Sequence, residues 1–126
     1  MMVVVVLVVD DLEAIRDLVV ATLEEYGAFQ FLTAADGREA LKLAAETRVD
    51  LVISDLEMPR MGGDELIRKL WNVQPNLLAI LMSGNPDKLN EVALPCPEQV
   101  KIMHKPFLPS QLRELVDDLV SPKPAA

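Results

Sequence analysis

The chain has 126 residues, of which 51% are hydrophobic and 25% charged, and this composition predicts one globular domain rather than a disordered segment. Its 12 Lys and Arg stand against 20 Asp and Glu, and the net charge of −8 argues against a surface that binds nucleic acid or anionic membranes. A single cysteine, Cys96, excludes an internal disulfide framework and a cysteine-based zinc site, which is typical of a reducing, cytoplasmic setting.

The chain begins with an apolar run at positions 3–9, which ends at two aspartates. The run has no basic segment before it and is too short to span a membrane, so it predicts a fully buried strand of a parallel sheet. Apolar residues over 15–26 then recur at helical spacing, and we expect Gly27 to close that helix. A second short strand is expected over residues 29–33.

The same alternation of apolar strands and amphipathic helices continues along the rest of the chain. Asp36 is expected to cap the second helix, whose apolar stripe lies at 40–45. Trp71 completes the stripe of a later helix, and we interpret it as a core residue rather than a docking anchor. The remaining elements are expected as strands over 51–54, 77–82 and 100–103 and as helices over 64–71 and 112–120.

Residues 84–99 do not follow this alternation, because the segment contains several prolines. Pro86 suits the first turn of a helix, whereas Pro95 and Pro97 must end one. A fourth helix is therefore expected to be short or irregular.

The alternation of strands and helices predicts an α/β fold with a five-stranded parallel sheet and helices on both faces. We expect the domain to occupy residues 1–120 and residues 121–126 to form a tail or linker. In sheets of this kind functional groups gather at the carboxyl ends of the strands. The residues that directly follow each predicted strand are therefore the candidates for a site.

Polar side chains stand at these strand ends, namely Asp10, Asp11, Asp55, Ser83 and Lys105. Carboxylates forced close together repel one another, and a cation such as Mg²⁺, which prefers oxygen ligands, removes the conflict. Together with Mg²⁺, the ammonium and the hydroxyl would neutralise a transferring phosphoryl group. The sequence has no glycine-rich phosphate loop, so a tightly held nucleotide is not expected.

Each of these residues also has a simpler interpretation. Asp10 and Asp11 suit the N-terminal cap of a helix, and Asp55 suits the start of a turn. Ser83 suits an ordinary strand-to-loop turn, and Lys105 a solvated loop. The position of all of them at one sheet edge favours a functional role for the set.

Four short motifs carry a resemblance to a known family, and they are VVDD at 8–11, ISDLEMPRMGG at 53–63, LMSG at 81–84 and HKPF at 104–107. As a set they resemble the receiver domain of two-component response regulators. The later part of the chain is similar to receivers at the C-terminus of hybrid sensor histidine kinases. The resemblance implies the flavodoxin-like strand order 2-1-3-4-5 and a cytoplasmic location. It also implies that a histidine kinase or a histidine phosphotransfer domain is the partner, with no nucleic-acid or membrane contact by this domain.

The resemblance further implies roles for individual residues. Asp55 is the expected phosphoacceptor, on which a kinase phosphohistidine places its phosphoryl group. Asp10 and Asp11, together with Asp55 and the backbone carbonyl of Glu57, are expected to bind Mg²⁺.

The remaining roles concern the switch. Ser83 is the expected switch hydroxyl, and Lys105 is expected to contact the phosphoryl group. The Lys105–Pro106 peptide bond is expected to be cis, as in the lysine–proline turn of the family. Glu57 and Asn85 are expected to flank the phosphoryl group and to tune its hydrolysis.

The sequence also departs from the family pattern. Ile102 stands where the family often has a rotating Tyr or Phe, so an aromatic swing cannot report phosphorylation. We expect reordering of residues 85–99 to report it instead. Gly62 stands where Asp is frequent, a change that we interpret as harmless. His104 is interpreted as structural, because a phosphorelay histidine is expected on an exposed helix.

A receiver is expected to catalyse only its own phosphorylation and dephosphorylation and is not otherwise an enzyme. Two functions of other classes remain as alternatives. One is a Mg²⁺-dependent phosphohydrolase with an aspartyl-phosphate intermediate. Such enzymes need two aspartates separated by one residue, whereas Asp10 and Asp11 are adjacent. The other is a non-phosphorylated pseudo-receiver that only binds proteins, and the presence of the complete set of site residues weighs against it.

Overall fold

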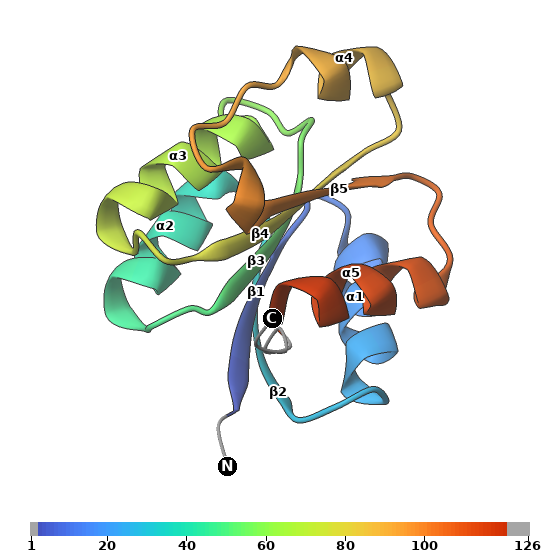
Figure 1. Ribbon diagram of the computed structural model, residues 1–126. Coiled ribbons are helices and arrows are strands. Elements are labelled where there is room, and N and C mark those ends of the chain that lie inside the picture. The colour runs from blue at the N-terminus through green and yellow to red at the C-terminus, as the bar shows by residue number, and fades with distance from the viewer. Residues whose placement is uncertain (1–2, 121–126) are drawn as a thin grey trace, which may run out of the picture.

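The structure, a computed structural model, describes residues 3–120, so the expected tail at 121–126 lies outside the described residues. A five-stranded sheet forms its centre (Figure 1). The elements in chain order are β1 (Val4–Val9), α1 (Glu13–Glu24), β2 (Phe29–Ala34), α2 (Gly37–Glu46), β3 (Leu51–Asp55), α3 (Gly63–Val73), β4 (Leu78–Ser83), α4 (Pro86–Glu91), the short 3₁₀ helix η1 (Pro97–Gln99), β5 (Val100–His104) and α5 (Pro109–Val120).

All strands of the sheet run parallel, and their order is β2-β1-β3-β4-β5, which confirms the expected fold. Neighbouring strands end almost level with one another. Val9 pairs with Ala34 and with Ser54, and Ser83 pairs with His104. The loops that leave the carboxyl ends of β1, β3, β4 and β5 therefore start at one edge of the sheet.

The alternating side chains of β1 show how one apolar run covers both faces of the sheet. Leu7 and Val9 are fully buried in the core cluster that includes residues of α2 and α3. Val6 and Val8 are fully buried in a second cluster with residues of α1 and α5. Figure 1 shows these two pairs of helices on opposite sides of the sheet. None of the helices within residues 3–120 is long and apolar enough to cross a membrane.

The expected helices form, but their bounds differ by one to three residues from the expected ranges. The carboxylate of Asp36 accepts a hydrogen bond from the N–H of Glu39 and caps α2, as expected. Helix α1 ends at Glu24, and Gly27 does not close it through a left-handed conformation, since no described glycine has a positive φ. The carbonyl of Leu23 instead accepts the N–H of Gly27 at 3.3 Å, so the chain turns without needing that conformation.

Trp71 lies in the core, as expected, with 8% of its surface exposed. Its indole N–H donates to the carbonyl of Leu77 at 2.8 Å, which satisfies the one polar atom of the ring. The side chain thus fixes the turn between α3 and β4 from inside the apolar cluster.

The proline-containing segment forms only a six-residue helix, α4, which confirms the expected short fourth helix. The segment that follows is irregular but anchored. The guanidinium of Arg68 donates to the carbonyl of Ala93 at 2.8 Å. The side-chain amide of Gln99 donates to the carbonyls of Pro75 and Leu77 at 3.0 and 2.9 Å. Residues 93–99 are therefore attached to α3 and to the turn after it.

Gly63 allows α3 to begin directly against the end of β3. A Cβ atom at Gly63 would collide with the carbonyl oxygen of Asp55 and with the side chain of Leu81. The N–H of Gly63 also donates to the carbonyl of Leu56 at 2.9 Å, which closes the loop between them. Because backbone approaches backbone here, only glycine fits without a shift.

We expect Gly63→Ala to lower the free energy of unfolding by about 1–3 kcal/mol, the usual cost of overpacking. Gly84→Ala is the matched control, because a Cβ at Gly84 would meet only ordinary contacts at 3.9 Å. Urea unfolding followed by circular dichroism measures both variants. Equal midpoints for the two variants would contradict the proposed close approach.

Candidate functional site

The polar residues expected at the strand ends do meet at one edge of the sheet. Asp10 directly follows β1, Asp55 is the last residue of β3, Ser83 is the last residue of β4 and Lys105 directly follows β5. Each therefore lies at the end of a strand or directly after it, where the sheet fixes its backbone.

Three carboxylates form a compact cluster at this edge. Asp10, Asp11 and Asp55 each offer one oxygen, and these oxygens lie within 4.8 Å of one another. Asp10 is completely buried and Asp55 is 7% exposed, whereas Asp11 is exposed. The interpretation of the aspartate pair as a helix cap is wrong, because Leu12 is the capping residue of α1 and no side chain caps this helix.

Lys105 provides the positive charge that this cluster lacks. Its ammonium lies 2.8 Å from a carboxylate oxygen of Asp10 and 3.3 Å from one of Asp55. Only 19% of the lysine side chain is exposed, so the interpretation of a solvated loop lysine is wrong. The Lys105–Pro106 bond is cis, as expected.

Burial governs the acid–base properties of this ion cluster. Burial raises the pKa of the Asp55 carboxyl above its ordinary value; the ammonium of Lys105 opposes this shift, and the charge of Asp10 adds to it. Burial alone would lower the pKa of Lys105, but the hydrogen bonds and charges of Asp10 and Asp55 outweigh it and raise that pKa. The ammonium therefore stays protonated, and the ionised form of Asp55 is incompletely compensated.

The cluster fits a hard divalent cation. Three carboxylates face one ammonium, and they offer the oxygen ligands that Mg²⁺ prefers, at separations that a single ion can bridge. The raised pKa of Asp55 indicates that burial makes its ionised carboxylate less stable than it would be in water, so an added positive charge would stabilise it. Asp11, the exposed member, lies on the solvent side of the cluster.

Ser83 is fully buried, and its hydroxyl points to a neighbouring carboxylate. It donates to Glu57 at 2.6 Å, and its oxygen accepts the N–H of Asn85 at 2.9 Å. Asn85 in turn caps α4, since its side-chain oxygen accepts the N–H groups of Asp87 and Lys88. Ser83 thus joins the site to the short fourth helix.

One residue of the site was missed by the sequence interpretation. The guanidinium of Arg16 donates to the backbone carbonyl of Asp10 at 2.7 Å and so fixes the chain where β1 ends. Its position one helical turn into α1 was the available signal, because the first turn of that helix returns beside the strand end.

Ile102 and His104 are both exposed on the edge strand β5. Any structural role of His104 therefore does not come from burial.

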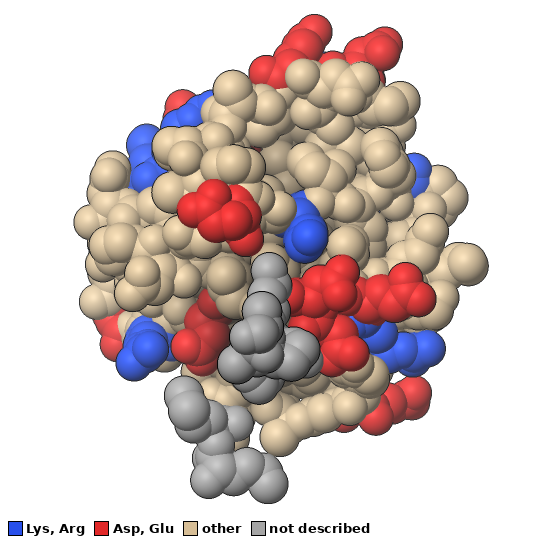
Figure 2. Space-filling view, viewed as in Figure 1, with Lys and Arg blue, Asp and Glu red and all other residues tan. Residues whose placement is uncertain are grey.

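One face of the molecule reflects the acidic composition. Figure 2 shows acidic side chains over α5 and at the tip formed by α4. Such a surface repels the phosphates of nucleic acid, which disfavours this face as a nucleic-acid interface. The acidic residues of these two helices are Asp87, Glu91, Glu114, Asp117 and Asp118.

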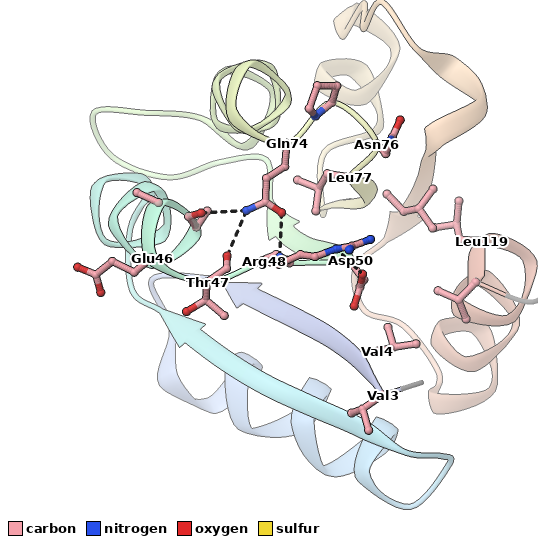
Figure 3. A pocket seen from close by; sticks show the side chains of 16 residues that line it. Val3, Val4, Glu46, Thr47, Arg48, Asp50, Gln74, Asn76, Leu77 and Leu119 are labelled. Carbon is pink, nitrogen blue, oxygen red and sulfur yellow. Dashed lines mark hydrogen bonds and ion pairs between the residues drawn. The ribbon is translucent and has the colours of Figure 1, made fainter. Parts of the chain in front are cut away.

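A hollow at the opposite, amino-terminal end of the strands carries no comparable chemistry (Figure 3). The side-chain amide of Gln74 points into it, but its NH₂ group donates to the carbonyls of Ala44 and Thr47 at 2.9 and 3.1 Å. Its oxygen accepts the N–H of Val49 at 2.8 Å. The amide therefore links the segment after α3 to the segment after α2, and its hydrogen-bonding groups already have protein partners.

Comparisons with known proteins agree with the geometry of the strand-end site. A family model described as the response regulator receiver domain matches residues 6–117. Protein-glutamate methylesterase/protein-glutamine glutaminase 2 of Caulobacter vibrioides is 39% identical over 89 residues, which are 71% of this chain and 26% of that protein. Sensor kinase CckA of Brucella abortus is 34% identical over 117 residues, which are 91% of this chain and 12% of that protein.

The chain thus spans only a minor part of these curated relatives. The solved structure of chemotaxis protein CheY4 from Vibrio cholerae, in contrast, is matched over its whole length. That comparison covers 94% of this chain and 100% of the other, with 31% identity and a TM-score of 0.81. Family model, relatives and solved structure agree, and the chain belongs to the receiver domain family of two-component response regulators.

Proposed function

We propose that Asp55 accepts a phosphoryl group from a phosphohistidine in a Mg²⁺-dependent reaction. Receiver domains are phosphoacceptors of two-component signalling rather than classical enzymes, and they interact with histidine kinases or phosphotransfer domains. The observation that carries the assignment to Asp55 is the ammonium of Lys105, which lies 3.3 Å from one carboxylate oxygen and is held by the buried Asp10.

The reaction is a nucleophilic displacement at phosphorus. A carboxylate oxygen of Asp55 attacks in line, and the bond between phosphorus and the histidine nitrogen breaks, with its electron pair leaving on the imidazole. Lys105 offsets negative charge on the transferring group, and Ser83 supplies a hydroxyl donor beside it. When bound to Asp10, Asp11, Asp55 and the backbone carbonyl of Glu57, Mg²⁺ supplies further positive charge for the same purpose.

The alternatives are less well supported by the same geometry. A phosphohydrolase of this kind needs two aspartates separated by one residue, one of which moves protons, whereas Asp10 and Asp11 are adjacent, and Asp10 is completely buried and is held by Lys105 at 2.8 Å. A pseudo-receiver has no need to gather three carboxylates and an ammonium at one edge, since their repulsion and burial oppose folding.

Some further assignments belong to the proposal. We infer that residues 1–120 form the receiver domain and that residues 121–126 form a tail or linker. The proposed partner is a histidine kinase or a histidine phosphotransfer domain, which places the reaction in the cytoplasm. The relatives include both a response regulator, GacA of Pseudomonas aeruginosa, and a sensor kinase, so the chain suits a separate regulator as well as the receiver of a hybrid kinase.

Phosphorylation is tested by intact-mass analysis after treatment with acetyl phosphate. We expect one added phosphoryl group with Mg²⁺ and none in EDTA, because the carboxylate cluster needs a cation to admit another anion. Asp55→Asn should take up no label under either condition. Equal labelling of this variant, or of the wild type in EDTA, would exclude Asp55 as the Mg²⁺-dependent acceptor.

The same site predicts a gain in stability when its charge is removed. Because the folded protein raises the pKa of Asp55, it binds the carboxyl proton more tightly than the unfolded chain does, so ionisation at neutral pH opposes folding. In EDTA at pH 7, Asp55→Asn should raise the free energy of unfolding by about 0.5–2 kcal/mol.

Urea unfolding checks this expectation, with Asp11→Asn as the matched control because that carboxylate is exposed. The control should gain less than Asp55→Asn does. Mg²⁺ should then stabilise the wild type more than Asp55→Asn, because a ligand stabilises the state that binds it better. A loss of stability in Asp55→Asn would show that its contact with Lys105 outweighs its burial.

A further inference from the structure

The hydroxyl of Ser83 has only one proton, and in this structure that proton is directed to one acceptor. It donates to the Oε1 atom of Glu57 at 2.6 Å, whereas the alternative acceptor, the carbonyl of Asn85, lies at 3.4 Å. The short distance and the charged acceptor make the contact with Glu57 the stronger one. A group that draws the proton elsewhere must therefore break the contact between Ser83 and Glu57.

The second oxygen of the same carboxylate reaches α4. Oε2 of Glu57 lies 3.7 Å from the ammonium of Lys88, which is in the middle of that short helix. The carboxylate thus bridges the end of β4 and the helix that follows it. A second connection runs through Asn85, which donates its N–H to Ser83 and caps the first turn of α4.

The segment after α4 is attached to other parts of the protein. Arg68 of α3 holds the carbonyl of Ala93, and Gln99 holds the carbonyl of Leu77. None of these contacts involves Ser83 or Glu57. The helix and the segment that follows it therefore have separate attachments, and one can loosen without the other.

We propose that the Glu57 side chain is a positioning residue that holds the Ser83 hydroxyl in the unphosphorylated state and couples this hydroxyl to α4 through Lys88. The proposal rests on the proposed phosphorylation of Asp55. A phosphoryl group on Asp55 competes with Glu57 for the single proton of Ser83, and its negative charge repels the Glu57 carboxylate.

The consequence is a specific loosening of one helix. When the Ser83 side chain rotates so that its hydroxyl donates to the phosphoryl group, Oγ moves away from both partners: Glu57 loses the donor that fixes it, and the N–H of Asn85 loses its acceptor. Residues 86–91 then lose their two links to the end of β4, whereas residues 93–99 keep theirs to Arg68 and Gln99. Of the segment 85–99, in which the sequence predicts reordering, only residues 86–91 are therefore expected to change.

Amide hydrogen exchange of the full chain tests the coupling before any phosphoryl chemistry. Lys88→Gln removes the charge that pairs with Glu57 and should speed exchange in residues 86–91 by up to about fivefold, the factor that exposed ion pairs support. Lys69→Gln is the matched control. Its partner is Glu65 at 3.6 Å, and both pairs are similarly exposed. The control should leave residues 86–91 unchanged.

The second arm uses the Mg²⁺–beryllofluoride form, which imitates the phosphorylated aspartate. The wild type should show faster exchange in residues 86–91 and little change in 93–99. The increase should be smaller in Lys88→Gln, in which the link is already broken. An increase of the same size in both proteins would overturn the proposed coupling.

The two arms separate this inference from the proposed function. If Lys88→Gln and Lys69→Gln show the same exchange without any phosphoryl analogue, the coupling through Glu57 is wrong even though Asp55 becomes phosphorylated. If intact-mass analysis shows no phosphorylation of Asp55, the proposed function is wrong. A difference between Lys88→Gln and its control would then still support the contact in the resting state.

Discussion

The ammonium of Lys105 is the contact on which the site depends. It lies 2.8 Å from the fully buried Asp10 and 3.3 Å from Asp55, and it is the counter-charge that makes burial of these carboxylates tolerable. Lys105 and Asp10 are 95 residues apart in the chain. The site is therefore complete only when β5, the last strand, has joined β4.

A parallel sheet makes such an arrangement possible because all its strands end on the same side. In β1, the apolar side chains pack against the two helical layers. Leu7 and Val9 lie on one face of the sheet, and Val6 and Val8 lie on the other. The polar groups of the site stand where the strands end. The core and the site are thus specified by successive parts of the same strand and do not compete for positions.

The sequence predicted the parts of the site that follow directly from strand ends. Asp10, Asp55, Ser83 and Lys105 each come at the end of an apolar run, and the parallel order alone brings them together. The contact of Arg16 with the carbonyl of Asp10 was not predicted, because it depends on how a long side chain returns from a helix to a loop.

The same limit applies to the pairing of Glu57 with Ser83 and Lys88. The motif at 53–63 places Glu57 near the site, but the sequence pattern does not give the direction of a side chain in a loop. Gly27 shows the opposite error, in which a residue type suggested a left-handed cap that the backbone does not adopt. The exposure of His104 was likewise invisible in the sequence, because it follows from the edge position of β5.

The short fourth helix suits a switch because few interactions hold it and each of them is modest. A helix of six residues is not stable alone, so α4 depends on the buried side chain of Leu89, on its cap and on the contact with Glu57. A hydrogen bond to a charged group contributes about 1.5–3 kcal/mol and an exposed ion pair about 0–1 kcal/mol. One added phosphoryl charge is enough to offset contributions of this size. Leu89 belongs to the apolar cluster that also contains residues of α2 and α3, and it is not part of the polar links. The helix can therefore change its attachment to Ser83 while Leu89 keeps it on the sheet, as the proposed coupling requires.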